Sequence, residues 1–393
     1  MNNSKEPNSS DIALYISRLS RSAGLIFVTL SLPFYLKDLG LDIVDIGVVY
    51  AFIIAFSVAE SLALGYLGDI TKYKYALLIA DFASLIGTIL IALAFNIYLI
   101  ILGMLLAGIS GSAGALRGSF APGLNAYILS TWKEESKQVK VLSRINLLSS
   151  IGSLIGSMLL EFNIFLRIPE ISFLRSMYLV SALLIFISLI SLTLIEENRH
   201  ENRKSSIMTK KSRSYAKKIL IINLINGAGM GLAIPLLPLF FSLIFNINIS
   251  KVGFIYFMSY ILTAFGSYIS YNIYSRLKSP EKIILFSRVA SGSILAFIPF
   301  ARFYILAIIL YSLRSFIAGI GAPARSILNI RGLDQENYGI GGSIAGGANR
   351  ISQTSSLISG YLADISLPLP IVLGGVLQVI VGFLYYEFTK DSR

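Results

Sequence analysis

The sequence predicts an all-helical membrane protein in which twelve transmembrane helices form two pseudo-symmetric six-helix bundles. The chain has 393 residues, of which 55% are hydrophobic and only 14% are charged, whereas about a quarter of the residues in a soluble domain are charged. Runs of roughly twenty apolar residues recur along the chain, and each is long enough to cross a ~30 Å hydrocarbon core as a helix. A sequence repeat divides these runs into two halves.

The predicted helices follow one another with mostly short connections. In order they cover residues 12–36, 44–68, 74–95, 97–130, 141–160, 172–195, 217–243, 250–274, 281–300, 303–328, 339–363 and 367–389. The fourth segment is longer than one crossing requires, so the ends of its helix stay open. We expect an N-terminal six-helix bundle over residues 1–195, a basic cytoplasmic linker over 196–216 and a C-terminal six-helix bundle over 217–393.

The internal repeat is visible residue by residue. Leu19, Ala23, Gly24, Leu32 and Pro33 recur with identical spacing as Leu224, Ala228, Gly229, Leu237 and Pro238. Further along, Ala121-Pro122 recurs as Ala322-Pro323, and Arg144-Ile145 recurs as Arg350-Ile351. A membrane protein built from two parallel halves commonly binds its substrate where the halves meet. The repeat therefore favours transport.

The distribution of Lys and Arg predicts the orientation in the membrane. If the N-terminus is cytoplasmic, the outer connections contain only four of these residues, Lys37, Arg167, Lys251 and Arg302, and many more fall on the inner side. By the positive-inside rule, both termini and the basic linker are cytoplasmic, and we expect a multi-pass protein of the plasma membrane. Anionic lipid of the inner leaflet accounts for the net charge of +12, so no nucleic-acid partner is expected.

A polar motif connects the second and third segments. It reads Gly65-Tyr66-Leu67-Gly68-Asp69-Ile70-Thr71-Lys72-Tyr73-Lys74. Small residues let a neighbouring helix approach, a carboxylate can meet helix N-termini, and lysines can anchor at headgroups. The motif resembles the loop signature of the major facilitator superfamily, roughly Gly-x-Leu-Ala-Asp-Arg-x-Gly-Arg-Lys. Gly65, Leu67, Asp69 and Lys74 match that signature, whereas Ile70, Lys72 and Tyr73 depart from it.

The resemblance extends over nearly the whole chain, because the stretches around Pro122 and Pro323 are similar to the fourth and tenth helices of that family. It implies two six-helix bundles that rock around a central cavity and carry a small-molecule substrate across the bilayer, as a monomer and without a cofactor. Gly65, Asp69, Lys72 and Lys74 would then act as gating residues that stabilise the outward-facing state. The alternative role for this motif is a helix cap with lysine anchors.

A glycine pair in the fifth segment bears on the direction of transport. Gly152 and Gly156 keep part of the antiporter signature of the family, but Ser153 stands where a proline is expected. Close helix packing explains two glycines at this spacing without invoking export. Export is preferred here on the general resemblance to drug-type exporters.

Several polar residues in the apolar segments are candidate substrate or coupling residues. They are Glu60, Asp81, Arg117, Arg314, Arg21, Asn223, Asn226 and Arg288. A charge near the bilayer centre costs on the order of 2.5–3.5 kcal/mol, so it normally faces protein or water. The repeat places Asn223 and Asn226 at the positions of Arg18 and Arg21, and Arg288 at the position of Asp81.

These residues allow two interpretations. In the functional one, Glu60 or Asp81 takes up a proton, while Arg117 or Arg314 binds an anionic group or tunes the pKa of the acid. In the structural one, the charges form static ion pairs between helices or belong to side chains that snorkel to the membrane surface. Glu60 is the preferred coupling residue because it lies deeper in its segment than Asp81 does.

A membrane enzyme and a passive channel are the rival classes. The only histidine, His200, lies in the basic linker, and the chain has no cysteine, so we expect no metal site of the usual His and Cys type and no Ser-His catalytic pair. No phosphate-binding loop is present, and no ring of like charges favours a channel. The sequence therefore predicts a secondary carrier that is not an enzyme, energised by protons.

Overall fold

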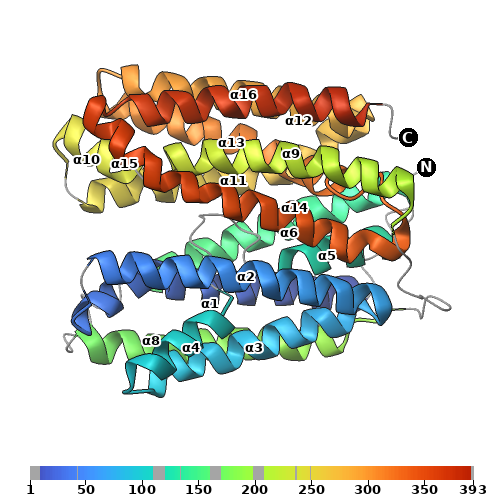
Figure 1. Ribbon diagram of the computed structural model, residues 1–393, viewed down its shortest axis with the longest axis horizontal. Coiled ribbons are helices and arrows are strands. Elements are labelled where there is room, and N and C mark those ends of the chain that lie inside the picture. Colours follow the sequence, from blue (N-terminus) through green and yellow to red (C-terminus); the bar gives the residue numbers. More distant parts are fainter. Residues whose placement is uncertain are drawn as a thin grey trace. The chain divides into compact units, whose positions relative to one another are not determined.

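The computed structural model describes residues 9–41, 43–108, 120–132, 134–159, 170–197, 208–234, 237–247 and 249–390. Every regular element in these ranges is a helix (Figure 1). This confirms the predicted all-helical fold.

The chain folds into two compact units. Unit 1 comprises residues 1–127 and 148–205, and unit 2 comprises residues 128–147 and 206–393. Residues 128–147 come from the first half of the sequence but belong to unit 2. Helix α6 (Glu135–Met158) therefore begins in unit 2 and ends in unit 1.

Unit 1 contains the helices of the first sequence repeat. They are α1 (Ser9–Asp38), α2 (Ile43–Ile70), α3 (Tyr73–Leu93), α4 (Ile97–Leu106), most of α5 (Phe120–Thr131), the second half of α6 and α8 (Glu170–Thr193). Helix α8 packs against both α1 and α3. Aromatic side chains hold α1 to α8, since Phe27 and Tyr35 both make edge-to-face contacts with Tyr178.

The glycine pair of the fifth predicted segment packs α6 against α1. A Cβ atom on Gly152 would collide with the carbonyl oxygen of Leu19, and one on Gly156 with that of Ala23. The close backbone approach requires glycine at both positions. Packing thus accounts for both residues, as the sequence allowed.

Unit 2 contains the helices of the second repeat. They are α9 (Lys210–Ala233), α10 (Leu237–Phe245), α11 (Ile249–Leu277), α12 (Pro280–Phe297), α13 (Tyr304–Leu328), α14 (Tyr338–Ile351), α15 (Ser356–Ile365) and α16 (Leu369–Thr389). Helix α12 packs against α13 and α16, and α13 packs against α11. A short 3-10 stretch, Ser352–Ser355, separates α14 from α15.

Each predicted segment overlaps described helices, but the seventh is divided between α9 and α10 and the eleventh between α14 and α15. The fourth is covered by α4 and α5, with residues 109–119 outside the described part of the chain. Seven of the described helices are long and apolar enough to cross a membrane, so the protein is a multi-pass membrane protein, and the count of twelve crossings stays a prediction. Helix α9, which corresponds to the seventh predicted segment, starts at Lys210, inside the predicted linker. Thr209 caps this helix, because its side chain accepts a hydrogen bond from the Ser212 N–H. The predicted domain boundaries also stay a prediction.

Candidate functional site

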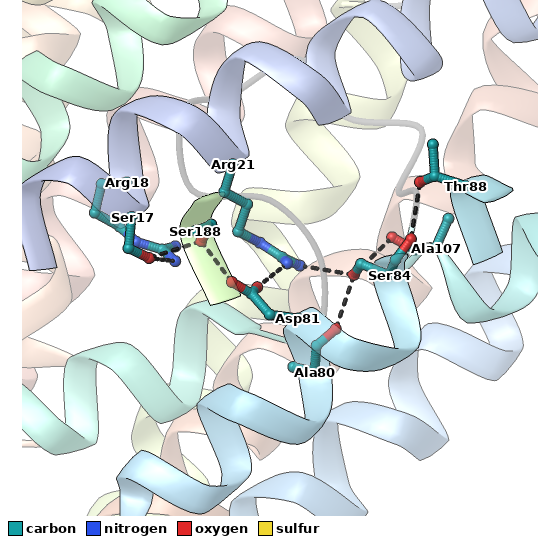
Figure 2. Close-up of polar contacts among 9 residues, drawn as sticks. All are labelled: Ser17, Arg18, Arg21, Ala80, Asp81, Ser84, Thr88, Ala107 and Ser188. Carbon is teal, nitrogen blue, oxygen red and sulfur yellow. Dashed lines mark hydrogen bonds and ion pairs between the residues drawn. The ribbon is translucent and has the colours of Figure 1, made fainter. Parts of the chain in front are cut away.

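A buried ion pair connects α1 and α3 in unit 1. The guanidinium of Arg21 donates to the carboxylate oxygen Oδ1 of Asp81, and the two residues are 2% and 0% exposed. The hydroxyl of Ser188 on α8 donates to the second oxygen, Oδ2. Figure 2 shows Asp81 between these two donors. One carboxylate thus joins three helices, and two of the predicted site residues are in direct contact.

The polar contacts continue on both sides of this pair (Figure 2). On one side, Arg21 Nη2 donates to Ser84 Oγ over 3.2 Å, and Ser84 Oγ lies 3.2 Å from the carbonyl oxygen of Ala107, just after α4. On the other side, Ser188 and Ser17 share a hydrogen bond of 2.8 Å, and Arg18 Nη2 donates to Ser17 Oγ over 3.0 Å. The drawn network contains two guanidinium groups and one carboxylate, so it has an excess of positive charge.

The predicted gating motif makes its described polar contacts within unit 1. The Tyr73 hydroxyl donates to Asp69 Oδ1 over 2.7 Å, and Asp69 is 3% exposed. Lys72 Nζ donates to the carbonyl oxygen of Glu197 over 2.9 Å. Lys74 Nζ donates to the carbonyl oxygens of Thr193 and Ile195 over 2.7 and 2.6 Å. These carbonyls lie at and just beyond the C-terminal end of α8, where cations are favourable.

Glu197 is a residue whose role the sequence did not reveal. Its carboxylate accepts hydrogen bonds from the main-chain N–H groups of Tyr73 over 3.2 Å and Lys74 over 2.8 Å. The first N–H groups of a helix have no partner within the helix, so Glu197 caps α3 in place of Lys72, whose side chain provides no cap. Its only signal in the sequence is an acidic residue immediately after the sixth apolar segment.

In unit 2 the asparagines that replace the two arginines of α1 bind other amides. Asn223 Nδ2 donates to Asn329 Oδ1 over 3.1 Å, and the Tyr385 hydroxyl donates to the same oxygen over 2.7 Å. Asn226 Nδ2 donates to Asn349 Oδ1 over 2.6 Å. Both predicted residues therefore lie in polar contacts between helices, but neither of these contacts contains a charge.

Two predicted arginines of unit 2 lie on neighbouring helices, Arg288 on α12 and Arg314 on α13. Arg314 is 8% exposed, and its guanidinium carbon lies 5.6 Å from the centre of the Tyr311 ring. Tyr311 in turn makes an edge-to-face contact with Tyr256 on α11, with 5.3 Å between the ring centres. Among the described residues, neither arginine forms an ion pair.

The remaining two candidates are Glu60 and Arg117. Glu60 lies on α2 and is half-buried. Arg117 lies outside the described residues. No group of three or more potential metal ligands occurs among the residues that the structure describes.

A second group of charges in unit 2 was not predicted. Arg331, just after α13, contacts Glu281 on α12 over 2.6 Å and Glu135 at the start of α6 over 3.4 Å. The Tyr274 hydroxyl on α11 donates to Glu135 Oε1 over 2.9 Å. These residues lie at helix ends, where charged side chains are common, so composition alone does not single them out.

Comparison with known proteins agrees with this architecture. The family model of the Major Facilitator Superfamily matches residues 12–355. No curated protein matches the chain. The crystal structure of the E. coli fucose:proton symporter FucP has a TM-score of 0.76 and 13% sequence identity, and the alignment covers 96% of this chain and 98% of that one.

Two further solved structures have the same fold. A bacterial homologue of the iron transporter ferroportin, in its outward-facing state, has a TM-score of 0.74 and 11% identity over 97% of this chain and 99% of that one. The human organic anion transporter MFSD10 (TETRAN) has a TM-score of 0.70 and 12% identity over 97% of this chain and 100% of that one. At such identities the likeness shows the fold alone.

Proposed function

Because this chain belongs to the Major Facilitator Superfamily and is a membrane transporter rather than an enzyme, we propose that it moves a small organic solute by alternating access, driven by a proton gradient. Export is the proposed direction. The observation that carries the proton coupling is the buried pair Arg21–Asp81, because a charge pair inside a membrane protein marks a candidate proton or substrate pathway.

Asp81 is the carboxylate through which this proposal couples protons to movement. In the structure the Arg21 guanidinium is the counter-charge of the Asp81 carboxylate. A proton on Asp81 removes the charge that holds Arg21, and Arg18 adds positive charge nearby through Ser17 and Ser188. Protonation would therefore loosen the contact of α1 with α3 and α8. Glu60, preferred from the sequence, stays the alternative coupling residue.

Alternating access also needs contacts that break and form again. We assign that role to the contacts of Glu135 with Arg331 and Tyr274, because α6 begins in unit 2 and continues into unit 1. The exposed fractions of the Arg331 and Glu135 side chains are 16% and 28%, so water can reach the pair when it separates. Gly65, Asp69, Lys72 and Lys74 stay proposed gating residues, since Asp69 and the two lysines fix the ends of α2, α3 and α8.

The proposed setting follows the charge bias of the sequence. The protein would lie in the plasma membrane as a monomer with both termini in the cytoplasm, in agreement with the positive-inside rule. A passive channel is the alternative within transport. A channel would conduct without saturation and without a conformational cycle.

The experiment begins with purified full-length protein in detergent. Metabolites, antibiotics and organic acids are screened by thermal shift, and each hit is then assayed for uptake into proteoliposomes with an imposed pH gradient. The proposal expects uptake that saturates with solute and needs the gradient. Asp81→Asn should abolish the effect of the gradient, while Glu60→Gln should retain it. The reverse result would assign coupling to Glu60, and gradient-independent, unsaturable flux would support a channel.

A further inference from the structure

In the described part of unit 2, arginines within the packed helices α12 and α13 form no ion pair with an acidic side chain. Two of its arginines lie in the middle of packed helices, Arg288 on α12 and Arg314 on α13, and Arg325 lies in the last turn of α13. The described ion pairs and hydrogen bonds of these helices include none to any of the three. The acidic residues of unit 2 that lie in its helices are near helix ends: Glu135, Glu281, Glu336, Asp364 and Glu387.

Helical geometry places Arg288 and Arg314 at a similar depth. Counted from the ends that the 298–303 connection joins, Arg288 and Arg314 each lie about 15 Å along their helices, at half the thickness of a hydrocarbon core. A Cβ atom on Gly321 would collide with the Ser287 side chain, so α12 and α13 touch directly beside Arg288. Arg325 lies about three turns beyond Arg314, on the same face of α13. Arg288 is within electrostatic range of both other arginines.

A comparison with unit 1 shows that the repeat in unit 2 has no carboxylate at the position of Asp81. In unit 1, Arg21 and Asp81 neutralise each other. At the matching positions of unit 2 the repeat has Asn226 and Arg288, so the carboxylate has become a cation and the cation has become an amide. A structural ion pair would have kept both signs. The repeat instead has a guanidinium at this position, and the described residues form no ion pair with it.

Arg314 has the properties of a ligand-binding residue. It is 8% exposed, its Nε has no hydrogen-bond partner among the described residues, and its guanidinium stacks near the Tyr311 ring. A buried guanidinium is costly unless it is paired. The neighbouring rings of Tyr311 and Tyr256 offer an apolar and aromatic surface beside that charge.

We propose that unit 2 holds the binding site for an organic anion, with Arg314 as the residue that binds the negative group and Arg288 and Arg325 providing the surrounding positive potential. This assignment rests on the proposed transport function and names its substrate class. A carboxylate or another delocalised oxyanion fits the planar donors of a guanidinium, and a hydrophobic body fits the adjacent tyrosines.

The test measures the electrostatic potential of the site without knowing the substrate. The natural chain has no cysteine, so Ala318→Cys provides a single thiol one turn from Arg314, on the face of α13 that also carries Arg325. Full-length protein in proteoliposomes is treated with two methanethiosulfonate reagents of opposite charge, the anionic sulfonatoethyl and the cationic trimethylammonioethyl reagent. Each rate is divided by the rate of that reagent with a free thiol.

The proposal expects the anionic reagent to be favoured by on the order of tenfold at this thiol, since a nearby unit charge in a low-dielectric site has an effect of that size. Adding Arg314→Gln should remove most of that preference. Arg314→Lys, which keeps the charge, should retain it and serves as the folded comparison if Arg314→Gln is unstable. Arg302→Gln changes an exposed arginine in the 298–303 connection and should have no effect.

A preference that survives Arg314→Gln would overturn the assignment. So would a thiol that neither reagent reaches, because a substrate site must be open to water in some state. The outcome is separable from that of the transport assay. Flux of a neutral solute without any anion preference at residue 318 would retain the carrier function and reject the anion site. A preference for the anionic reagent without any solute flux would retain the anion site and reject the carrier function.

Discussion

The carboxylate of Asp81 on α3 is held between the guanidinium of Arg21 on α1 and the hydroxyl of Ser188 on α8, and it is fully buried. Both charged residues come from segments that the sequence marks as membrane-spanning. The packing of α1, α3 and α8 at this point therefore depends on the charge of Asp81. Its energetics can be measured separately from transport.

Breaking this pair from one side should destabilise the protein strongly. Arg21→Met or Asp81→Leu leaves one buried charge without its partner, which costs about 3–5 kcal/mol. The double variant removes both charges and should lose much less than the sum of the two single losses. The measurement is a double-mutant cycle of unfolding in detergent. Additive losses would show that the two residues do not interact.

Glu197 should stabilise α3 although it lies far away in the sequence. Glu197→Ala removes the acceptor for the N–H groups of Tyr73 and Lys74, and the loss of such a cap costs about 1 kcal/mol. The midpoint of thermal unfolding should fall accordingly. Glu196→Ala is the matched control, because Glu196 is exposed and should leave the midpoint unchanged. Equal effects of the two variants would contradict the capping role.

Glu135 should control the conformational equilibrium, whereas its neighbour Glu134 should not. Glu135→Gln weakens the contacts with Arg331 and Tyr274, so the start of α6 should separate more often from α11. Spin labels on cysteines introduced at the exposed positions 137 and 275 report this as a larger fraction of long distances. Glu134 is exposed and its carboxylate accepts a hydrogen bond from Ser136, two residues away, so Glu134→Gln is the control. An unchanged distance distribution in Glu135→Gln would remove the proposed gate.

Asp334 should make the stability of unit 2 depend on pH in the acidic range. Hydrogen bonds from the hydroxyls of Ser212 and Thr209 lower the pKa of this loop carboxyl below its ordinary value of 3.8, and the bond from Ser212 has the larger effect. A lowered pKa in the folded state stabilises the fold above the ordinary value, and this contribution is lost as the pH falls through the folded-state pKa. Unfolding midpoints between about pH 6 and pH 3 should therefore fall less steeply in Asp334→Asn than in the natural protein. Glu336→Gln, at an exposed position nearby, should follow the natural protein; identical curves for all three would contradict this account.

The helices could be predicted from the sequence because each apolar segment has a length that only a membrane-spanning helix explains. The partner of Asp81 could not, because a repeat and a hydropathy pattern fix which segments are helical but not which faces meet. Arg21 and Asp81 were both candidates, yet their pairing appears only when α1 and α3 are placed in contact. The glycines at 152 and 156 were predictable as packing residues, because two small residues one turn apart let a neighbouring helix approach closely.

The contacts at the helix ends were the least predictable part of the site. Lys72 and Lys74 were expected at the gate or at headgroups; in the structure they donate to carbonyl oxygens at the end of α8, and their gating role stays a prediction. Glu197, Glu135 and Arg331 act through partners at least fifty positions away. Their contacts depend on the tertiary arrangement of loops, which short-range sequence patterns do not encode.

Movement of protons together with solute is the most direct test of the central claim. Proteoliposomes with a trapped pH indicator and no initial gradient are given an outward gradient of the solute that shifts the melting temperature most. The account predicts proton movement that requires the solute, saturates with its concentration and disappears in Asp81→Asn. Solute movement without any accompanying proton flux, or proton flux that is independent of the solute, would contradict it.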